Sequence, residues 1–361
     1  MADYRVFAAA PLARAIEAVL AAGGSDAGEA RIVAANLLEA NLKGHDSHGI
    51  GMIPRYVDAL LEGGLKPNAH VEITLDGGAL LTLDGCMGYG QVIGREAMAL
   101  AIERARQHGS SVMALGRAHH LGRIGAWAEQ AVAQGLVSLH FVNVISRSIV
   151  APYGGGDARF GTNPVCIGIP LPGEPPFLLD MATSAVAQGK IRVAYNKGER
   201  VAEGLLIDDK GNPTTEAQYG VIEPFGALTT FGLHKGYGLA VAAELLGGAL
   251  TGAGTWHSDD RSKRRVWNGM LTIVIDPKRL GKQAVFEQEA REFLKSLRRS
   301  PVAPGFDKVR IAGEPEREWQ AKREKEGIPV DPATWDEILA AAGKLKLEAA
   351  AVERLALAIH G

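Results

Sequence analysis

This chain has few cysteines and no large excess of positive or negative charge. Its 361 residues include only Cys86 and Cys166, too few for a disulfide framework or a four-cysteine zinc site. We therefore expect a reducing compartment. Lys and Arg number 39 and Asp and Glu 41, for a net charge of -2. Because no basic excess is available to neutralise phosphates, we expect no nucleic-acid partner.

Long apolar runs are also missing. The stretch 8–24 is interrupted by Arg14 and Glu17, and the stretch 236–254 contains Glu244 and six glycines. A spanning helix needs about 20 predominantly apolar residues, and a signal peptide needs a basic start and a cleavage site. We predict no membrane segment and no signal peptide, and we expect a cytoplasmic protein.

The length and composition predict a folded chain of more than one domain. At roughly 150 residues per domain, 361 residues correspond to two or three domains. Hydrophobic residues make up 47% and charged residues 22% of the chain, which excludes disorder as its overall state. Glycine accounts for 45 of the 361 residues, a larger share than the usual ~7%. They predict tight turns and places where backbone approaches a small ligand closely.

Hydrophobic periodicity predicts helices at both chain ends and an α/β region between them. Asp26 and Glu29 form a predicted capping box, and Asp331 followed by Pro332 predicts another helix start. The predicted helices are 11–22, 26–43, 53–63, 91–107, 331–342 and 347–359; the predicted strands are 71–75, 79–83, 111–115, 137–144, 165–169, 177–179 and 270–275. We expect residues 1–70 and 318–361 to form one discontinuous helical domain beside an α/β core of residues 71–317.

The segment His45-Asp-Ser-His-Gly49 is the densest group of chemically active side chains. A histidine can exchange a proton near neutral pH, and Gly49 would admit a substrate or a backbone segment. The alternative is a polar turn in which Asp46 or Ser47 caps the next helix. A third interpretation is a metal site of the HD hydrolase type with His45, Asp46 and His48 as ligands, but further ligands at a recognisable spacing are lacking.

A second group follows the predicted strand 111–115. His119, His120 and Arg123 lie in a glycine-containing turn before a helix. A planar guanidinium at such a turn is suited to a bidentate bond with a carboxylate. We expect His119 to be a hydrogen-bonded core residue.

Two glycine-rich turns, 85–94 and 153–164, invite comparison with nucleotide-binding loops. The first has its third glycine one position late for GxGxxG, and the second has no Walker lysine. We therefore reject a P-loop and a standard Rossmann domain. Asp180 ends an apolar strand and either orients an imidazole or caps the following segment. His234-Lys235 opens a small-residue helix whose lysine and N-terminus could hold phosphate or ribose oxygens.

Four motifs in order resemble the malate/L-lactate dehydrogenase family that is unrelated to the Rossmann-fold lactate and malate dehydrogenases. They are His45–Gly49, Gly161–Pro164, Leu179–Ala182 and His234–Gly238. The resemblance spans nearly the whole chain, and segments 45–56 and 119–125 are most similar to the hydroxycarboxylate dehydrogenase B branch. It implies an α/β (α+β) fold with a mixed, largely antiparallel sheet beside a discontinuous helical domain.

The resemblance also implies an activity. It implies a homodimeric oxidoreductase that interconverts 2-oxo acids and 2-hydroxy acids with NAD or NADP, without a metal. His48 would be the general acid/base and Asp180 its partner. The implied substrate-binding residues are Ser47, His120, Arg123, Thr162 and Asn163, and the implied cofactor-binding residues are Leu178, Leu179, Asp180, Met181, Ala182, His234, Lys235, Gly313 and Glu314.

One position departs from the family pattern. Many members carry arginine four residues after the catalytic histidine, where this chain has Met52. The cation for the substrate carboxylate must then come from elsewhere, and we rank Arg123 first and Arg55 second. The rival functions are a metal-dependent HD-type hydrolase and a non-catalytic small-ligand-binding protein.

Overall fold

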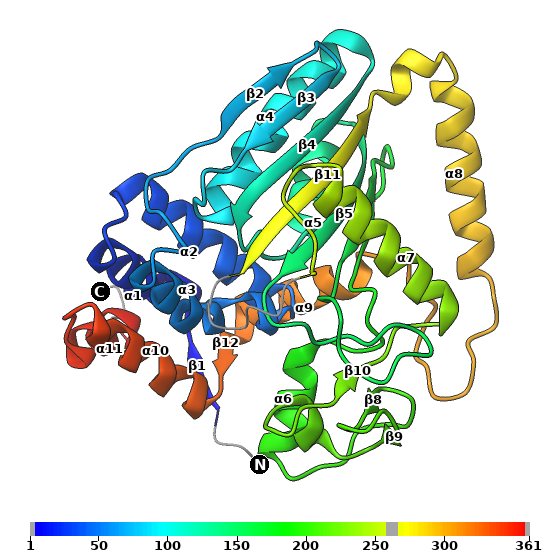
Figure 1. The fold of residues 1–361 in the computed structure, drawn as a ribbon. Helices are drawn as coiled ribbons and strands as arrows, with labels where there is room; N and C mark the ends of the chain where they lie inside the picture. The colour runs from blue at the N-terminus through cyan, green and yellow to red at the C-terminus, as the bar shows by residue number, and fades with distance from the viewer. Residues whose placement is uncertain (1–3, 258–265, 358–361) are drawn as a thin grey trace.

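A seven-stranded sheet lies at the centre of the computed structural model, which describes residues 4–257 and 266–357. Figure 1 shows it running from β2 at one edge toward α5 and α7. Its strand order is β2-β3-β4-β11-β5-β6-β7. The strands are β2 (Glu72–Asp76), β3 (Leu80–Asp84), β4 (Ser110–His119), β11 (Trp267–Ile275), β5 (Val137–Ile145), β6 (Val165–Ile169) and β7 (Phe177–Met181).

Within this sheet only β3 and β4 pair in parallel, and every other neighbouring pair is antiparallel. The expected mixed, largely antiparallel sheet is therefore confirmed. It differs from the parallel doubly wound sheet of a Rossmann domain, in which helical crossovers join parallel strands.

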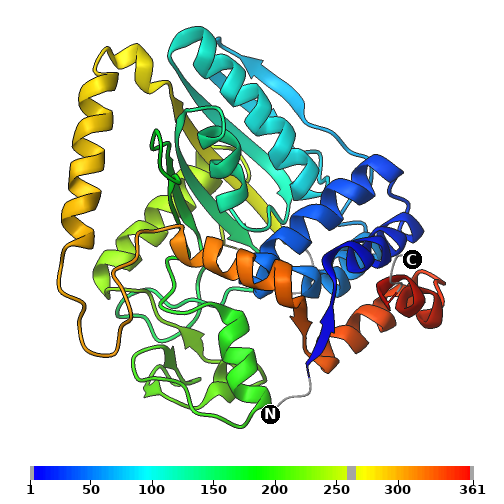
Figure 2. The same cartoon turned by 180° about the vertical axis from the view of Figure 1, so that it is seen from behind.

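Helices cover both faces of the sheet, as the two opposite views in Figures 1 and 2 show. On one face lie α4 (Gly90–His108) and α5 (Gly125–Val132), whose apolar residues share a core with Leu83 and Leu115 of the sheet. On the other lie α7 (His234–Glu244) and the π-helical turn η4 (Leu245–Ala249). Glycine permits this contact, because a Cβ at Gly269 would lie 2.0 Å from the carbonyl oxygen of Gly247.

The two chain ends share a separate core. It contains Phe7, Leu37 and Trp335, and the rings of Phe7 and Trp335 lie 4.6 Å apart. The contributing elements are α1 (Ala9–Ala22), α2 (Ala27–Leu42), α3 (Ile53–Leu61), α10 (Pro332–Lys344) and α11 (Ala349–Leu357), and β1 (Arg5–Phe7) pairs with β12 (Ile328–Val330). Residues 1–3 and 358–361, which belong to the predicted helical domain and include the end of the predicted helix 347–359, lie outside the described residues.

Local capping signals account for several helix starts. Asp26 accepts a hydrogen bond from the backbone N–H of Glu29 at 2.8 Å, and Asp331 caps α10 in the same way through Thr334 at 2.9 Å. The predicted capping box is only half formed, because Glu29 accepts hydrogen bonds from Ser25 and Asn68 instead of returning to Asp26. The N–H of Asp26 donates instead to Asn68 Oδ1 at 2.8 Å, so a side chain 42 residues away replaces the local partner.

Several elements were not predicted from the sequence. They are α6 (Gln188–Asn196), the small sheet of β8 (Leu206–Ile207), β9 (Pro213–Thr214) and β10 (Ala227–Leu228), the short helices η3 (Ala217–Gly220) and η5 (Pro277–Leu280), α8 (Gln283–Arg298), and α9 (Glu314–Glu326). Figure 2 shows α9 crossing toward the helical unit formed by the chain ends. Among the described residues, no helix is long and apolar enough to cross a membrane.

Candidate active site

The turn that carries His48 is two short helices, η1 (Asp46–His48) and η2 (Ile50–Met52), between α2 and α3. Asp46 accepts hydrogen bonds from Asn41 Nδ2 at 2.7 Å and from two guanidinium nitrogens of Arg323 at 2.7 and 2.9 Å. Gly49 is required here because a Cβ would lie 2.2 Å from Asn41 Oδ1, which accepts the N–H of Ile50. The turn is therefore fixed between α2 and α9.

The three side chains of the metal interpretation do not converge. His45 Nε2 lies 3.3 Å from Glu316, Asp46 is engaged by Arg323, and His48 Nδ1 lies 3.0 Å from the hydroxyl of Ser47. In residues 4–257 and 266–357 no group of three or more His, Cys, Asp or Glu side chains is placed to hold a metal ion. The geometry instead joins His45 and Asp46 to α9.

His48 faces a second imidazole. Its ring stacks on that of His120, with centroids 5.5 Å apart and planes 18° from parallel. Burial, assisted by the positive charges of His45 and Arg123, lowers the pKa of His48 to about 4, and burial beside His48 holds the pKa of His120 well below its ordinary value. Both rings are therefore neutral near pH 7, the state in which an imidazole can accept a proton.

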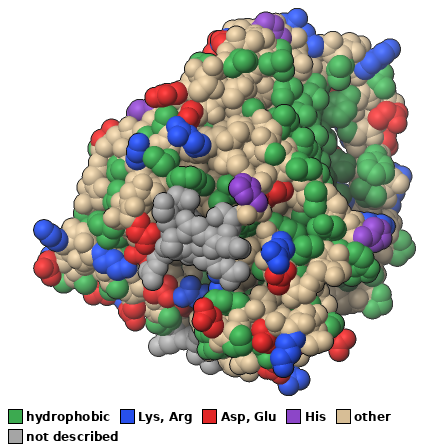
Figure 3. Space-filling model, in the orientation of Figure 1, with side chains coloured by type: hydrophobic (Ala, Val, Ile, Leu, Met, Phe, Trp, Pro, Cys, Tyr) green, Lys and Arg blue, Asp and Glu red, His purple; other side chains and the backbone are tan. Residues whose placement is uncertain are grey.

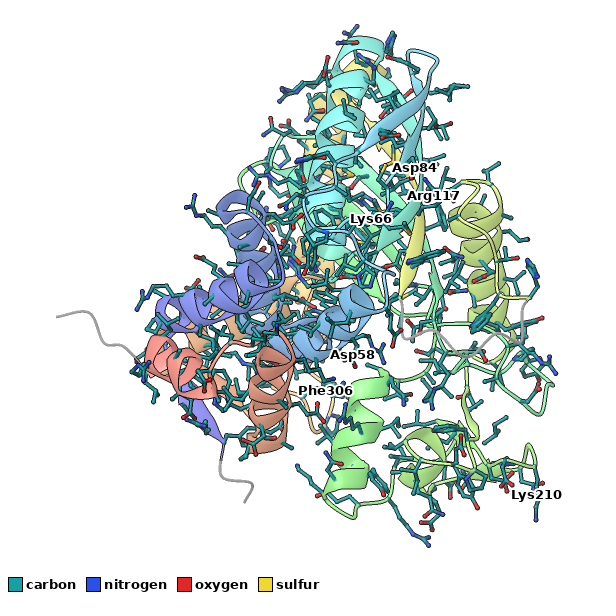
Figure 4. The ribbon with its side chains drawn as sticks, turned by 60° about the vertical axis from the view of Figure 1, so that its left-hand side comes forward. Asp58, Lys66, Asp84, Arg117, Lys210 and Phe306 are labelled. Carbon is teal, nitrogen blue, oxygen red and sulfur yellow. The ribbon has the colours of Figure 1, made fainter. Side chains whose placement is uncertain are left out.

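The glycine-rich turn 85–94 supports this pair of rings. A Cβ at Gly90 would lie 2.2 Å from the carbonyl oxygen of His120, so the start of α4 packs directly on its backbone. Asp84 accepts the N–H of Cys86 at 2.7 Å and pairs with Arg117. Figure 4 shows Asp84 and Arg117 together at the ends of β3 and β4. The turn is thus part of the scaffold of the histidine site.

His119 is buried as predicted, but its ring makes no hydrogen bond within the described residues. Neither ring nitrogen has a partner in the described part of the chain, and the ring stands edge-on to Tyr56 at 5.4 Å. Burial lowers the pKa of His119 to about 3. The expectation of a hydrogen-bonded core residue therefore needs correction: this imidazole contributes shape and contact, not hydrogen bonds.

Arg123 is committed to protein carboxylates. Its side chain is 2% exposed, it donates to Glu129, and it lies 3.5 Å from Glu39. Lys43 shares both acids and approaches Glu129 to 2.7 Å. Nη1 of the guanidinium is buried without a partner among the described residues. A free fork for a substrate carboxylate is therefore not available at Arg123.

Asp180 lies near the charge of Arg123, and its described hydrogen bond does not go to His48. Its Oδ2 accepts the N–H of Gly125, the first residue of α5, at 2.7 Å. A Cβ at Gly125 would lie 2.2 Å from Arg123 Nη1 and 3.0 Å from that oxygen. Burial raises the pKa of Asp180, and the charge of Arg123 opposes that shift. Asp180 thus caps α5 from a distant strand, whereas its expected pairing with His48 is absent from the described hydrogen bonds.

Arg55 has the opposite environment to Arg123. It lies on α3 one turn beyond Met52, it is exposed, and its charge reaches both His119 and His120. Among the described residues no carboxylate forms an ion pair with it. Its neighbour Arg192, in contrast, is paired with Glu337 at 2.5 Å. Surrounding protein lowers the pKa of Arg55, although a guanidinium stays charged at neutral pH.

The predicted substrate residues Thr162 and Asn163 serve the fold. Asn163 is fully buried, and its amide donates to Glu244 at 2.7 Å and to Ala240 O while accepting the N–H of Val144. The carbonyl of Thr162 accepts both the N–H and the hydroxyl of Thr183 at 2.9 Å. The amide nitrogen of Asn163 therefore donates to two groups of the fold, and its oxygen accepts from a third.

The predicted cofactor segment 178–182 is the outer edge of the sheet. On that edge Leu178 donates its N–H to Ala312 O at 3.1 Å, away from the neighbouring strand β6. Because every second residue of a strand directs its backbone groups to the same side, those of Asp180 and Ala182 also point away from the sheet. Gly313, at φ 93°, packs against Leu178, and a Cβ there would lie 3.1 Å from the Leu178 side chain. Glu314 pairs with Arg298 at 3.0 Å.

The other end of this edge leads to α7. Phe231 donates its N–H to Thr183 O at 3.1 Å, and the exposed His234 and Lys235 follow at the start of the helix. The N–H groups of Lys235 and Gly236 already donate to Gly232 and Phe231, so the helix start offers side chains and few free N–H groups. Outward backbone groups, a cation and an imidazole are a donor set that fits a dinucleotide.

The sequence matches known proteins over most of its length. Residues 7–339 match the family model described as malate/L-lactate dehydrogenase. The chain is 46% identical to hydroxycarboxylate dehydrogenase B of Escherichia coli (strain K12) over 333 residues, which cover 91% of each chain. It is 42% identical to L-lactate dehydrogenase of Cupriavidus necator, covering 88% of this chain and 91% of that one.

A solved structure supports the same grouping. Sulfolactate dehydrogenase from Methanocaldococcus jannaschii superimposes with a TM-score of 0.83 at 32% identity, covering 96% of this chain and 99% of that chain. A match over most of the sequence, together with the same fold, decides the relationship. The chain belongs to the malate/L-lactate dehydrogenase family.

Proposed function

We propose that this chain interconverts 2-hydroxy acids and 2-oxo acids with NAD or NADP, and that His48 carries the proton. The observation that supports this most strongly is the stacking of two neutral imidazoles, His48, on a turn fixed by Arg323, and His120, which follows β4. A hydroxyl proton must leave as hydride departs from the carbinol carbon. Neutral His48 takes it during oxidation, and the imidazolium returns it during reduction.

The nicotinamide cofactor, when bound, supplies the hydride acceptor or donor. The outward backbone groups of Asp180 and Ala182, together with His234 and Lys235, are the proposed contacts for it. Leu178 and Gly313 are proposed to close one end of that edge.

We further propose that Arg55 anchors the substrate carboxylate, which reverses the ranking made from the sequence. Arg55 is exposed near His120 and is not paired with an acid among the described residues, whereas Arg123 is buried against Glu129 and Glu39. An anion beside Arg55 would gain a charge-assisted, bidentate bond. An anion beside Arg123 would have to compete with two protein carboxylates.

A homodimer is the proposed assembly. Among its residues α8 buries only Leu294, and it exposes Val285 and Phe293, at 57% and 63%. Leu245 and Leu250 next to α7 are also exposed, and Figure 3 shows hydrophobic side chains gathered where α7 and α8 face each other. Such an apolar face is typical of an interface between subunits. A second copy of the chain would remove it from water.

The test of the proposed activity is a panel of 2-oxo acids assayed with NADH and with NADPH. Consumption of the reduced nicotinamide, followed by its near-ultraviolet absorbance, is expected for at least one acid. The reverse reaction should appear with the matching 2-hydroxy acid and oxidised cofactor. Enzyme treated with a chelator should retain its rate, because the proposed chemistry uses no metal. Absence of turnover with either cofactor across the panel would refute the proposal.

A further inference from the structure

Behind the two imidazoles lies a buried line of polar side chains that the proposed reaction does not yet use. Gln91 Nε2 donates to the hydroxyl of Tyr56 at 2.8 Å, and that hydroxyl lies 2.8 Å from His120 Nδ1. Gln91 and Tyr56 are each 1% exposed. The three residues come from α4, α3 and the turn after β4, so the contact exists only in the folded chain.

The direction of this line follows from the cost of burying unpaired groups. With Gln91 donating, one buried oxygen, Gln91 Oε1, is left without a partner among the described residues. In the reverse direction, Gln91 Oε1 would accept a hydrogen bond from the Tyr56 hydroxyl. The buried amide nitrogen of Gln91 would then be left without an acceptor. Orphaned N–H groups are rarer in proteins than carbonyl oxygens with spare capacity, so the donating orientation is favoured.

The direction fixes the position of a proton on His120. A tyrosine hydroxyl that accepts from Gln91 has its own hydrogen free to donate to His120 Nδ1. A neutral imidazole that accepts at Nδ1 carries its proton on Nε2. His120 Nε2 has no hydrogen-bond partner in the described structure and is not among its buried unpartnered atoms, so it remains open to a ligand.

We propose that Gln91 and Tyr56 are positioning residues that hold the proton of His120 on Nε2, where it donates a hydrogen bond to the substrate oxygen. This inference rests on the proposed function, in which His48 exchanges the proton of the same oxygen. The two stacked rings then divide the work: His48 moves the proton and His120 steadies the developing negative charge. A preorganised donor of this kind stabilises the transition state more than the ground state.

The burial of His120 supports this division. Its low pKa keeps the ring neutral, so that the donor does not titrate together with His48. The positive charge of Arg55, and any proton taken up by His48 or His119, disfavours protonation of this ring. A neutral donor therefore remains a donor over the whole pH range in which His48 is neutral.

The first experiment reads the tautomer directly. Protein labelled with 15N-histidine is examined by NMR at neutral pH, with His120 assigned from the spectrum of the His120→Asn variant. We expect a protonated Nε2 and an unprotonated Nδ1 for His120. A protonated Nδ1 would overturn the inference. Because this measurement needs no turnover, its result is independent of the oxo-acid assay: failure of that assay would refute the function and leave the tautomer assignment intact.

The second experiment uses two variants and a matched control. Tyr56→Phe removes the link, and Gln91→Glu at alkaline pH substitutes an acceptor that draws the Tyr56 hydrogen away from His120. We expect kcat to fall by about 10²-fold, the scale for loss of one transition-state donor, with cofactor Kd unchanged. Gln107→Glu places the same charge at an exposed position of α4 and should leave kcat intact. Unchanged kcat in both folded variants would overturn the inference; if Gln91→Glu fails to fold, Tyr56→Phe and the wild-type spectrum decide.

Discussion

Arg323 donates two hydrogen bonds, 2.7 and 2.9 Å long, to the carboxylate of Asp46, 277 residues earlier in the chain. Arg323 belongs to α9, and Asp46 begins the short helix that ends at His48. The guanidinium side chain is 10% exposed and that of Asp46 is 51% exposed. The C-terminal part of the chain thus sets the position of the histidine that we propose as the proton carrier.

Replacing Arg323 with lysine should loosen this turn. An ammonium cannot form the paired bonds of a guanidinium, and with Asp46 half exposed the stability loss should be about 1 kcal/mol. We expect kcat to fall by more than the stability loss accounts for, with little change in cofactor affinity. Urea unfolding and steady-state kinetics measure both. Arg310→Lys, at an exposed pair with Asp307, is the control; equal kcat values in the two variants would contradict the positioning role.

Replacing His48 with glutamine should remove the proton carrier while preserving the shape of the turn. General acid/base catalysis contributes typically 10²–10⁴-fold, so kcat should fall by that amount while NADH or NADPH still binds. Fluorescence titration of the cofactor and single-turnover kinetics test the two parts. His70→Gln, at an exposed histidine paired with Glu96, should have no effect. A loss below about tenfold would exclude His48 as the proton carrier.

Arg55 and Arg123 should respond differently to substitution by lysine. Hydrogen bonds to charged groups are worth about 1.5–3 kcal/mol, so Arg55→Lys should raise KM for 2-oxo acids roughly 10- to 100-fold and leave KM for the cofactor unchanged. Arg123→Lys should lower the free energy of unfolding instead, since it loosens a buried pair with Glu129. The reverse pattern would return the carboxylate role to Arg123.

Acid should destabilise the fold through its buried histidines. His140 is fully buried between Thr272 and Ser138, and burial lowers its pKa to about 3. Below the unfolded value near 6.5, the unfolded chain binds a proton that the native ring does not, so stability falls as pH drops from about 6.5 toward 3. Between pH 7 and 5 this histidine alone should cost about 2 kcal/mol.

Urea unfolding at several pH values measures this slope. His48 and His119 have lowered pKa values of about 4 and about 3 and add to it in the same direction. The His140→Gln variant should show a shallower decline of unfolding free energy with falling pH than the wild type, whatever its stability at pH 7. Identical slopes in the two proteins would mean that His140 takes up its proton without unfolding.

The exposed face of α8 should control assembly. Phe293→Glu places a charge in the centre of that face and should convert a dimer into monomers in sedimentation velocity runs at micromolar concentration. Ile73→Glu, at an exposed apolar residue of the edge strand β2, is the matched control and should leave the assembly unchanged. A wild-type protein that sediments only as a monomer would refute the proposed homodimer.

Short-range signals were predictable from the sequence. The helix starts at Asp26 and Asp331, the strands of the central sheet and the buried face of α4 follow from neighbours only a few residues apart. Motif order was also sufficient to indicate the family and to single out His48. The helix starts and strands could be predicted because capping and strand alternation depend on local geometry. The division into a 1–70 and 318–361 domain and a 71–317 domain stays a prediction.

Only the tertiary structure decided which charged residues pair with one another. From the sequence alone, Arg123 and Arg55 are equally good candidates to bind a carboxylate. In the structure Glu129 and Glu39 lie next to Arg123, whereas no acid forms an ion pair with Arg55 among the described residues. Asp180 was expected to pair with His48, and its described hydrogen bond is accepted from the N–H of Gly125, 55 residues away. The energy of a buried charge depends on which opposite charges and hydrogen-bond donors surround it, and those neighbours come from distant parts of the chain.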